Sequence, residues 1–167
     1  DFETLEALFF QSASAYYHLP SACMIGFSGE TDCIASLIAS PAVKRILTVE
    51  PTNQEYQQAA ESAEKEWLWF PGLNDPHYEI PVDSIVQKLE PDDLVILQHP
   101  NCPTGTALDE DSIQQVVSAA EESKARVCID EAYIELVSTS SIAPLVFKHK
   151  NLLVRRSLSD FFGLQQS

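Results

Sequence analysis

Two carboxyl groups and a phenol follow a short apolar run in the last third of the chain. Residues 127–129 are Val-Cys-Ile, and Asp130, Glu131 and Tyr133 come directly after them. Such a run predicts a buried parallel strand that carries Asp130 to the carboxyl edge of a sheet, where ligands of open α/β sheets bind. Two interpretations are open: the acid serves a bound ligand, or it caps the turn or helix that follows.

Three further segments are expected at the same edge. Residues 98–105 and 155–163 each follow a predicted strand, and residues 26–31 join a predicted strand to a predicted helix. The last of these carries Gly26 and Gly29, so it has the order of an anion cradle at a helix N-terminus. An ordinary strand-to-helix turn is the alternative, because two glycines are a weak signal.

The elements that must position these segments alternate between strand and helix. Several strands are continuous apolar runs, as expected when both faces of a sheet are covered. The predicted fold class is therefore α/β, with a parallel-dominated sheet and helices on both faces. Six strands are predicted, at residues 22–25, 45–49, 66–70, 94–97, 127–129 and 151–154. Helices are predicted at residues 3–17, 32–40, 54–65 and 82–89, and one more begins after Asp109 or Asp111, while 134–147 is ambiguous.

The helix after residue 109 has the clearest pattern. Asp109 or Asp111 is expected to cap it. Its apolar face consists of Ile113, Val116, Val117 and Ala120.

Composition excludes several classes of function. The balance of 10 basic to 25 acidic residues gives a formal charge of -15, which disfavours nucleic acid and anionic membranes as partners. No apolar stretch approaches the about 18 residues of a membrane span. None of the four cysteines forms a CxxC pair, so buried reduced thiols, at Cys23 and Cys128 above all, are expected in a cytoplasmic protein without a zinc site. A length of 167 residues is enough for a single domain, residues 1–167, although the chain starts inside a predicted helix and is expected to be a fragment.

Four motifs in order carry a resemblance to a known family. They are residues 51–56 (Pro-Thr-Asn-Gln-Glu-Tyr), 101–105 (Asn-Cys-Pro-Thr-Gly), 130–133 (Asp-Glu-Ala-Tyr) and 157–164 (Ser-Leu-Ser-Asp-Phe-Phe-Gly-Leu). Together they resemble the fold-type I pyridoxal-phosphate enzymes, in the class I/II aminotransferase branch that includes histidinol-phosphate aminotransferase and threonine-phosphate decarboxylase. The resemblance covers nearly the whole chain as the central part of the large, cofactor-binding domain.

The resemblance implies roles for two residues of the 130–133 motif. Pyridoxal phosphate is an electron sink whose ring nitrogen must stay protonated. Asp130 would lie beside that nitrogen and raise its pKa. Tyr133 would donate a hydrogen bond to the phenolic oxygen of the cofactor; the alternative is a packed tyrosine.

The resemblance also implies a phosphate site. Ser157 and Ser159 would donate to the phosphate, together with the backbone N–H groups of Gly29, Glu30 and Thr31 at a helix start. Helix capping is the alternative role of the serines.

Three positions depart from the family pattern. The lysine that forms the Schiff base should follow Ser159, but Asp160 stands there, and a carboxylate cannot form an imine. The asparagine that contacts the phenolic oxygen is replaced by Cys102, a poor hydrogen-bond donor. The aromatic residue that stacks on the ring is replaced by Asn53; the alternative is that Tyr56 of the same motif reaches the ring instead.

Other parts of the family's site are not expected in this chain. Lys148 and Lys150 precede the last predicted strand, so they should lie at the opposite, amino edge of the sheet. The segment that closes over the substrate, a phosphate-binding arginine, the arginine for the substrate carboxylate and the small domain would lie outside residues 1–167.

Three hypotheses follow. The first is a pyridoxal-phosphate enzyme of the aminotransferase or decarboxylase type, acting on amino acids or amino-acid phosphates. The second keeps the fold without the chemistry, as a module that binds a small amino-acid-type ligand or a partner; the three departures favour it. The third, an unrelated nucleotide-binding domain, lacks any GxGxxG or Walker motif. A homodimer is implied by the family.

Overall fold

The computed structural model describes residues 2–73, 77–137, 140–158 and 163. Its centre is a five-stranded sheet in the order β2-β1-β3-β4-β5, and every neighbouring pair is parallel. The predicted α/β class with a parallel-dominated sheet is confirmed. The strands are β1 (Arg45–Glu50), β2 (Glu66–Pro71), β3 (Asp93–Gln98), β4 (Arg126–Asp130) and β5 (Leu152–Arg155).

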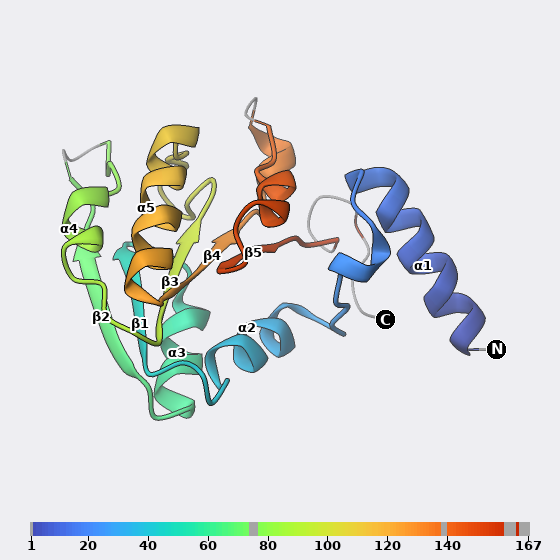
Figure 1. Cartoon of the computed structure of the whole chain (residues 1–167), viewed down its shortest axis with the longest axis horizontal. Coiled ribbons are helices and arrows are strands. Elements are labelled where there is room, and N and C mark those ends of the chain that lie inside the picture. The colour runs from blue at the N-terminus through green and yellow to red at the C-terminus, as the bar shows by residue number, and fades with distance from the viewer. Residues whose placement is uncertain (1, 74–76, 138–139, 159–162, 164–167) are drawn as a thin grey trace.

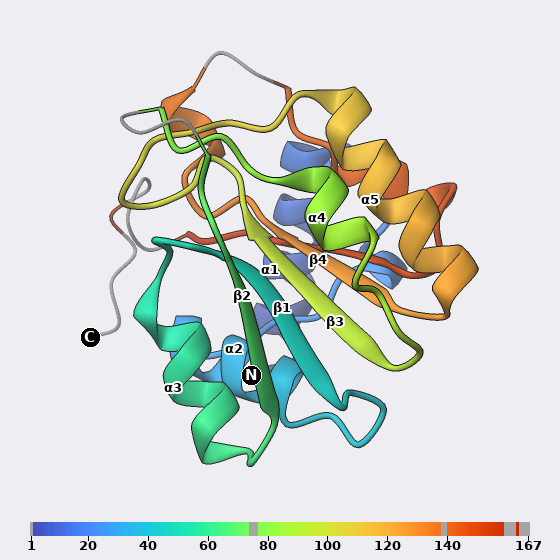
Figure 2. The ribbon, with the colours of Figure 1, turned by 90° about the vertical axis from the view of Figure 1, so that its left-hand side faces the viewer.

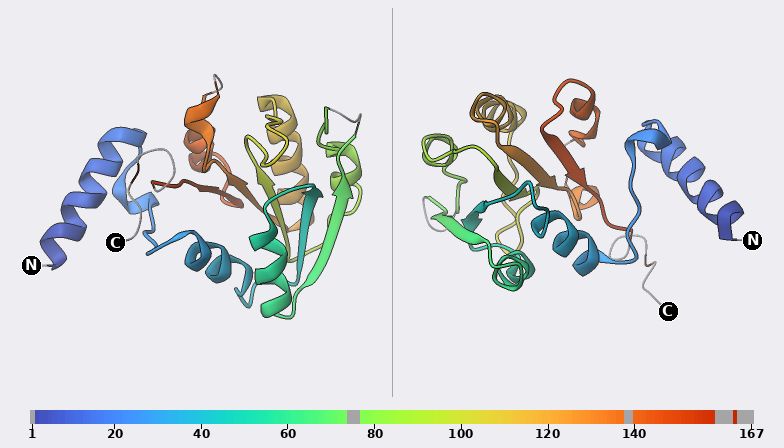
Figure 3. Two further views of the ribbon diagram at one scale, coloured as in Figure 1. Left: turned by 180° about the vertical axis from the view of Figure 1, so that it is seen from behind. Right: turned by 60° about the horizontal axis from the view of Figure 1, so that its bottom comes forward.

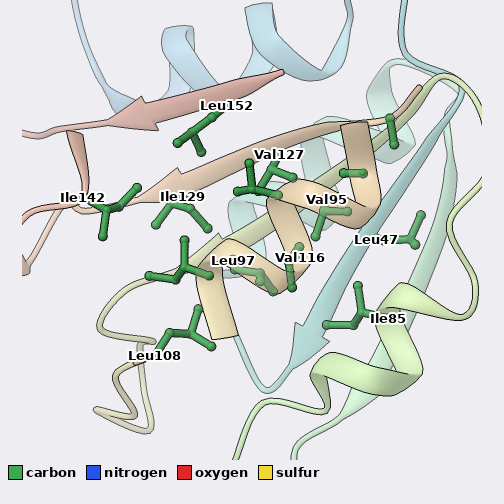
Figure 4. Packing of buried hydrophobic residues seen from close by; sticks show 14 of the residues in the cluster. Leu47, Ile85, Val95, Leu97, Leu108, Val116, Val127, Ile129, Ile142 and Leu152 are labelled. Atoms are coloured by element: carbon green, nitrogen blue, oxygen red, sulfur yellow. The ribbon is translucent and has the colours of Figure 1, made fainter. Parts of the chain in front are cut away.

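Helices cover both faces of this sheet (Figures 1 and 2). On one face, α2 and α3 pack over a cluster that includes Ile46, Leu94 and Ile96. On the other face, α4 and α5 enclose a larger cluster around Val95, Leu97 and Ile129 (Figure 4). The helices are α1 (Phe2–Tyr17), α2 (Glu30–Ile38), α3 (Gln54–Ser62), α4 (Val82–Val86) and α5 (Glu110–Ser123), and the 3-10 helices are η1 (Ser21–Cys23), η2 (Ile134–Leu136) and η3 (Ala143–Phe147).

Burial explains why the central strands are apolar without interruption. All six residues of β3 are buried, and so are the last four of β4. A strand covered on both faces has no solvent side that would favour alternating polar residues. The ends of these strands are therefore the only places where polar side chains can gather.

Helix α5 begins as its sequence predicts. The carboxylate of Asp109 accepts from the backbone N–H of Ser112 at 2.7 Å, which satisfies one of the free amides of the first turn. Its predicted apolar face is buried against the sheet. The helix ends at Ser123, and Lys124, which follows it as the cap, has a left-handed φ of 60°.

The predicted strand at 22–25 is wrong. Residues 21–23 form η1 instead, in which the N–H of Cys23 donates to the carbonyl of Pro20 at 2.9 Å and that of Met24 to Ser21 at 3.0 Å. These amides bond locally, and no described segment pairs with the far side of β5 to offer a sheet neighbour. Ile25 is 81% exposed and Cys23 is exposed as well, so the prediction of a buried Cys23 thiol is also wrong, whereas Cys128 is buried.

Helix α1 lies beyond the β5 edge, apart from the helices that cover the sheet (Figures 1 and 3). Leu5, Leu8 and Phe9 on this helix are exposed. The ambiguous segment 134–147 contains η2 and η3. None of the helices in the described part of the chain is long and apolar enough to cross a membrane.

Candidate functional site

The carboxyl edge of the sheet gathers the predicted site residues. Asp130 is the last residue of β4, and Gln98 and Arg155 end the neighbouring strands β3 and β5. Glu30 starts α2 near the same edge, because it contacts Arg155. Parallel strands deliver their carboxyl ends to one side, and that is why residues far apart in sequence meet here.

Asp130 is fully buried and accepts three hydrogen bonds. The hydroxyl of Tyr56 and the guanidinium of Arg155 both donate to Oδ2. The backbone N–H of Ala132 donates to Oδ1 at 3.0 Å. The acid therefore does stabilise the turn after its strand, as the simpler interpretation holds, and it also anchors two side chains.

Arg155 is a central residue of the site that sequence reasoning missed. It lies opposite Asp130 in the register of β4 and β5, so both side chains face the same way. Its guanidinium joins Asp130 to Glu30, with Nη2 at 2.9 Å from the Glu30 carboxylate. Burial alone would lower the pKa of Arg155, but the two carboxylates outweigh burial and raise it. A charged residue at the end of an apolar strand, next to a strand ending in an acid, was the available signal.

Tyr56 points into the sheet rather than across a ligand ring. It is 1% exposed, and its hydroxyl donates to Asp130. Burial and the negative charge of Asp130 both raise the pKa of this phenol, so it stays protonated and remains a donor. The prediction that Tyr56 reaches a cofactor ring is not matched by this orientation.

The predicted anion cradle carries an acid at its centre. Gly29 precedes α2 in an extended conformation, and Glu30 is the first residue of the helix. The Glu30 carboxylate accepts from the Asn53 amide at 3.2 Å and from Arg155. Burial raises the pKa of Glu30, while the charge of Arg155 opposes that shift. An acid at this position competes with any anion for the positive end of the helix dipole.

The remaining predicted residues lie around the same edge. Tyr133 is half-buried, Ser157 is buried and Cys102 is exposed. The backbone N–H of Cys102 donates to the side-chain oxygen of Gln98 at 2.9 Å. Ser159 and Asp160 lie outside the described residues.

A cavity of about 500 Å³ opens at this edge. It lies where the strand order reverses between β1 and β3, the position at which open α/β sheets bind ligands. Its size is within the range of small-molecule sites. The lining includes the predicted residues Glu30, Cys102 and Tyr133, and Thr52, Glu55 and Gln98, which sequence reasoning did not single out.

Within the part of the chain that the structure describes, three polar atoms of this lining are buried without a hydrogen-bond partner. They are Oγ1 of Thr52, Oε2 of Glu55 and Nε2 of Gln98. Thr52 is 8% exposed and Gln98 is 1% exposed. Buried polar atoms usually have partners, and those that lack one call for an explanation.

A family model supports what the motifs indicate. The model of aminotransferase class I and II matches residues 2–166. The chain belongs to the class I and II aminotransferase family. Histidinol-phosphate aminotransferase of Methanococcoides burtonii is 31% identical over 156 residues, covering 90% of this chain and 41% of that protein. The chain thus spans less than half the length of this relative.

Solved structures of the aminotransferase family and its relatives share the fold. Histidinol-phosphate aminotransferase from Clostridium acetobutylicum has a TM-score of 0.73 at 27% identity, covering 81% of this chain and 40% of that one. L-threonine-O-3-phosphate decarboxylase from Porphyromonas gingivalis has a TM-score of 0.74 at 20% identity, covering 93% of this chain and 45% of that one. A pyridoxal-phosphate-bound C–S lyase from Staphylococcus hominis has a TM-score of 0.72 at 21% identity, covering 84% of this chain and 41% of that one. The predicted resemblance is confirmed, and pyridoxal phosphate is the cofactor expected for the family.

The described residues fit that cofactor poorly at its ring nitrogen. A carboxylate offers about four acceptor sites, and three of those of Asp130 are taken by Tyr56, Arg155 and Ala132. A protonated ring nitrogen would also approach the guanidinium of Arg155, a like charge. The role of Asp130 toward the cofactor remains a prediction, and this geometry argues against it.

Proposed function

We propose that this member of the aminotransferase family is impaired in covalent pyridoxal-phosphate chemistry and acts as a non-catalytic module that binds a small ligand in its cleft. The observation that carries the proposal is the engagement of Asp130. Its buried carboxylate is bonded to Arg155 and Tyr56, so the acid that would tune the cofactor serves the protein's own ion pair.

The sequence adds an independent reason. Asp160 occupies the position at which the family places its reactive lysine, and a carboxylate supplies neither an imine nor a proton-carrying amine. Lys148 and Lys150 come just before β5, at the amino edge of a wholly parallel sheet. They therefore lie at the opposite edge of the sheet from Asp130 and cannot take the place of the reactive lysine.

A second candidate is an active aminotransferase or decarboxylase that acts on amino acids or amino-acid phosphates. The likeness to histidinol-phosphate aminotransferase favours it, at 31% identity over 90% of the chain. This function requires a lysine from outside the described residues to reach the cleft, and it requires Arg155 to leave Asp130.

Absorbance spectroscopy separates the two candidates. We expect that the protein mixed with pyridoxal phosphate develops no visible band that borohydride removes beyond that of surface lysines. Asp160→Lys is expected to restore a weak band, and the pair Asp160→Lys with Arg155→Leu a stronger one. Glu122→Lys, on the exposed side of α5, controls for an added surface lysine. A borohydride-sensitive band in the unaltered protein would refute the proposal.

Two further expectations belong to this proposal. The family implies a homodimer, which analytical ultracentrifugation of the protein would test. The four cysteines are free, which agrees with a reducing compartment such as the cytoplasm. Fractionation of cells would test that location.

A further inference from the structure

We infer that the outer edge of strand β2 is a docking site for an extended, lysine- or arginine-rich segment of another protein, which adds a strand beside Trp67 and Trp69. No residue of β2 lines the cleft between β1 and β3. The inference therefore goes beyond the proposed function and does not depend on it.

The free backbone groups of β2 follow from its pairing with β1. β2 is the outermost strand on its side (Figure 1), and no described segment pairs with its outer side. The N–H of Gly72 donates to the carbonyl of Glu50 at the end of β1 at 2.9 Å. Because successive residues of a strand direct their N–H and C=O groups to alternate sides, Leu68 also faces β1, whereas Trp67 and Trp69 face outward. Each tryptophan thus offers a donor and an acceptor to a further strand.

The side chains of the two tryptophans lie on one face of the sheet, since the residues are two positions apart. Trp67 packs against the cluster beneath α2 and α3, whereas Trp69 is 52% exposed. The face of an exposed tryptophan ring attracts a lysine or arginine side chain. An added strand with cations opposite these rings gains this attraction together with its backbone hydrogen bonds.

The charge beside this edge also favours a basic partner. Glu64 and Glu66 are exposed, and neither forms a salt bridge within the described part of the chain. Lys65 lies between them in sequence, but its Nζ donates to the carbonyls of Ser40 and Val43 and is directed away from them. The acids at the start of β2 are therefore free to attract cations of a docked segment.

Two other arrangements are less favourable. A second copy of the chain would bring the same glutamates and a formal charge of -15 to the edge, so the two copies would repel each other. The β5 edge ends in Arg155, followed by Arg156, which disfavours a basic segment there, and α1 lies beyond it (Figure 3). Pro71 has no N–H and limits the usable part of the β2 edge to a few residues.

Four capped peptides test the inference by titration followed by nuclear magnetic resonance. The first is Thr-Lys-Val-Lys-Val-Lys-Thr, and the second has glutamate in place of lysine. The third and fourth are copies of the first with methylated backbone nitrogens, at the lysines in one and at the valines in the other. We expect the basic peptide to bind at least roughly tenfold more tightly than the acidic one.

The methylated copies distinguish strand addition from adsorption to an acidic surface. Only alternate N–H groups of a docked strand face β2, so one copy should lose at least roughly tenfold in affinity and the other should bind like the first peptide. Equal affinity of the two methylated copies overturns the inference, and so does binding of the acidic peptide as tight as that of the basic one.

Amide hydrogen exchange locates the docked strand. In the free protein the N–H groups of Trp67 and Trp69 should exchange quickly and that of Leu68 slowly, and the basic peptide should slow exchange at both tryptophans. Slow exchange at the tryptophans in the free protein overturns the inference, because the edge would already be covered. Analytical ultracentrifugation then shows whether a second copy or another segment of the same molecule covers it.

A pair of variants completes the test. Trp69→Thr keeps a residue that suits a strand, removes the ring and should weaken binding of the basic peptide by roughly fivefold. Leu153→Thr, at a position on β5 that is 43% exposed, is the matched control at the opposite edge and should leave affinity unchanged. Equal affinity of the two variants overturns the inference. The peptide comparison and the exchange measurement use the unaltered protein, so they decide the question even if Trp69→Thr fails to fold.

Discussion

Asp130 and Arg155 form a cross-strand ion pair inside the sheet edge, where their side chains are 0% and 6% exposed. Removal of one partner from such a pair leaves an uncompensated buried charge. Arg155 also bonds to Glu30, so one guanidinium holds the start of α2 against the end of β4. The pair thus has a structural role, because it joins two strands of the sheet and the start of a helix.

Arg155→Leu should lower the free energy of unfolding by about 3–5 kcal/mol, because it leaves Asp130 and Glu30 without their cation. Addition of Asp130→Asn should recover part of that loss, and the two changes should be strongly coupled. Urea unfolding of the four proteins of this double-mutant cycle provides the measurement. Additive effects would show that the pair is not formed in solution.

Tyr56→Phe should destabilise the protein by about 1.5–3 kcal/mol, since it removes a buried hydrogen bond to a charged acceptor. Tyr78→Phe, at a partly exposed position, is the control and should change stability by no more than about 0.5 kcal/mol. Thermal and urea unfolding of both variants give the comparison. A loss for Tyr56→Phe as small as that of the control would contradict the hydrogen bond.

Sequence patterns predicted the sheet because the local sequence of each central strand is enough to identify it as a strand. The runs 94–97 and 127–129 are wholly apolar and flanked by turns, and both are strands. The run 22–25 has the same composition but lies beside a proline turn, and its amides are bonded within that turn. A short apolar run cannot show by itself whether a neighbouring strand exists.

The same distinction applies to the site. The position of Asp130 at the carboxyl edge follows from the local sequence. The ion pair with Arg155 depends on the register of β4 against β5, and the partnerless Gln98 amide depends on the loop after β3. Contacts between segments distant in sequence are set by packing, which no single motif encodes.

Arg156 connects the end of α1 to the loop after β4. Its guanidinium bonds to Glu131 at 2.9 Å and to Glu135, and lies 4.7 Å from the centre of the Tyr17 ring. Arg156→Met should lower the free energy of unfolding by about 3 kcal/mol, because it leaves the buried carboxylate of Glu131 without its cation. It should also speed amide hydrogen exchange in α1. Hydrogen–deuterium exchange gives the readout, with Arg126→Met as the control. Unchanged exchange in α1 would show that the helix is held by other contacts.

His99 should make the protein sensitive to mild acid. Burial lowers its pKa from the ordinary 6.5, while the charge of Glu131 opposes that shift, and Nδ1 accepts from the N–H of Leu108. Well above pH 6.5 the residue is neutral in both states; as the pH falls through 6.5, the unfolded chain binds a proton that the folded protein does not. The free energy of unfolding should therefore fall as pH decreases below 6.5.

The contribution of His99 to that dependence can be isolated. His99→Asn supplies an oxygen acceptor for the N–H of Leu108 without a titrating ring, so the fall in stability below pH 6.5 should be shallower. Urea unfolding between about pH 5 and pH 7.5, the range around an ordinary histidine pKa, measures it. His77→Asn, at an exposed histidine, is the control for loss of an imidazole. An identical slope in His99→Asn and the unaltered protein would rule out this role.

Two buried threonines should respond oppositely to the same substitution. The hydroxyl of Thr48 donates to the carbonyl of Ile96 at 2.7 Å, whereas the hydroxyl of Thr52 has no partner among the described residues. Thr48→Val should lower the free energy of unfolding by about 1 kcal/mol, the typical net value of a hydrogen bond. Thr52→Val removes an unsatisfied buried group without loss of a bond and should raise the free energy of unfolding by up to about 1 kcal/mol.

The Thr52 variant also links stability to the cleft. A polar atom kept without a partner destabilises the free protein, which is the trade-off expected of a site that binds a ligand. Thr52→Val should therefore be more stable than the unaltered protein, while Thr48→Val should be less stable. Urea unfolding of the two variants and of the unaltered protein gives the free energies to compare. If both substitutions destabilise the protein equally, the Thr52 hydroxyl has a hydrogen-bond partner in solution, and the prediction is contradicted.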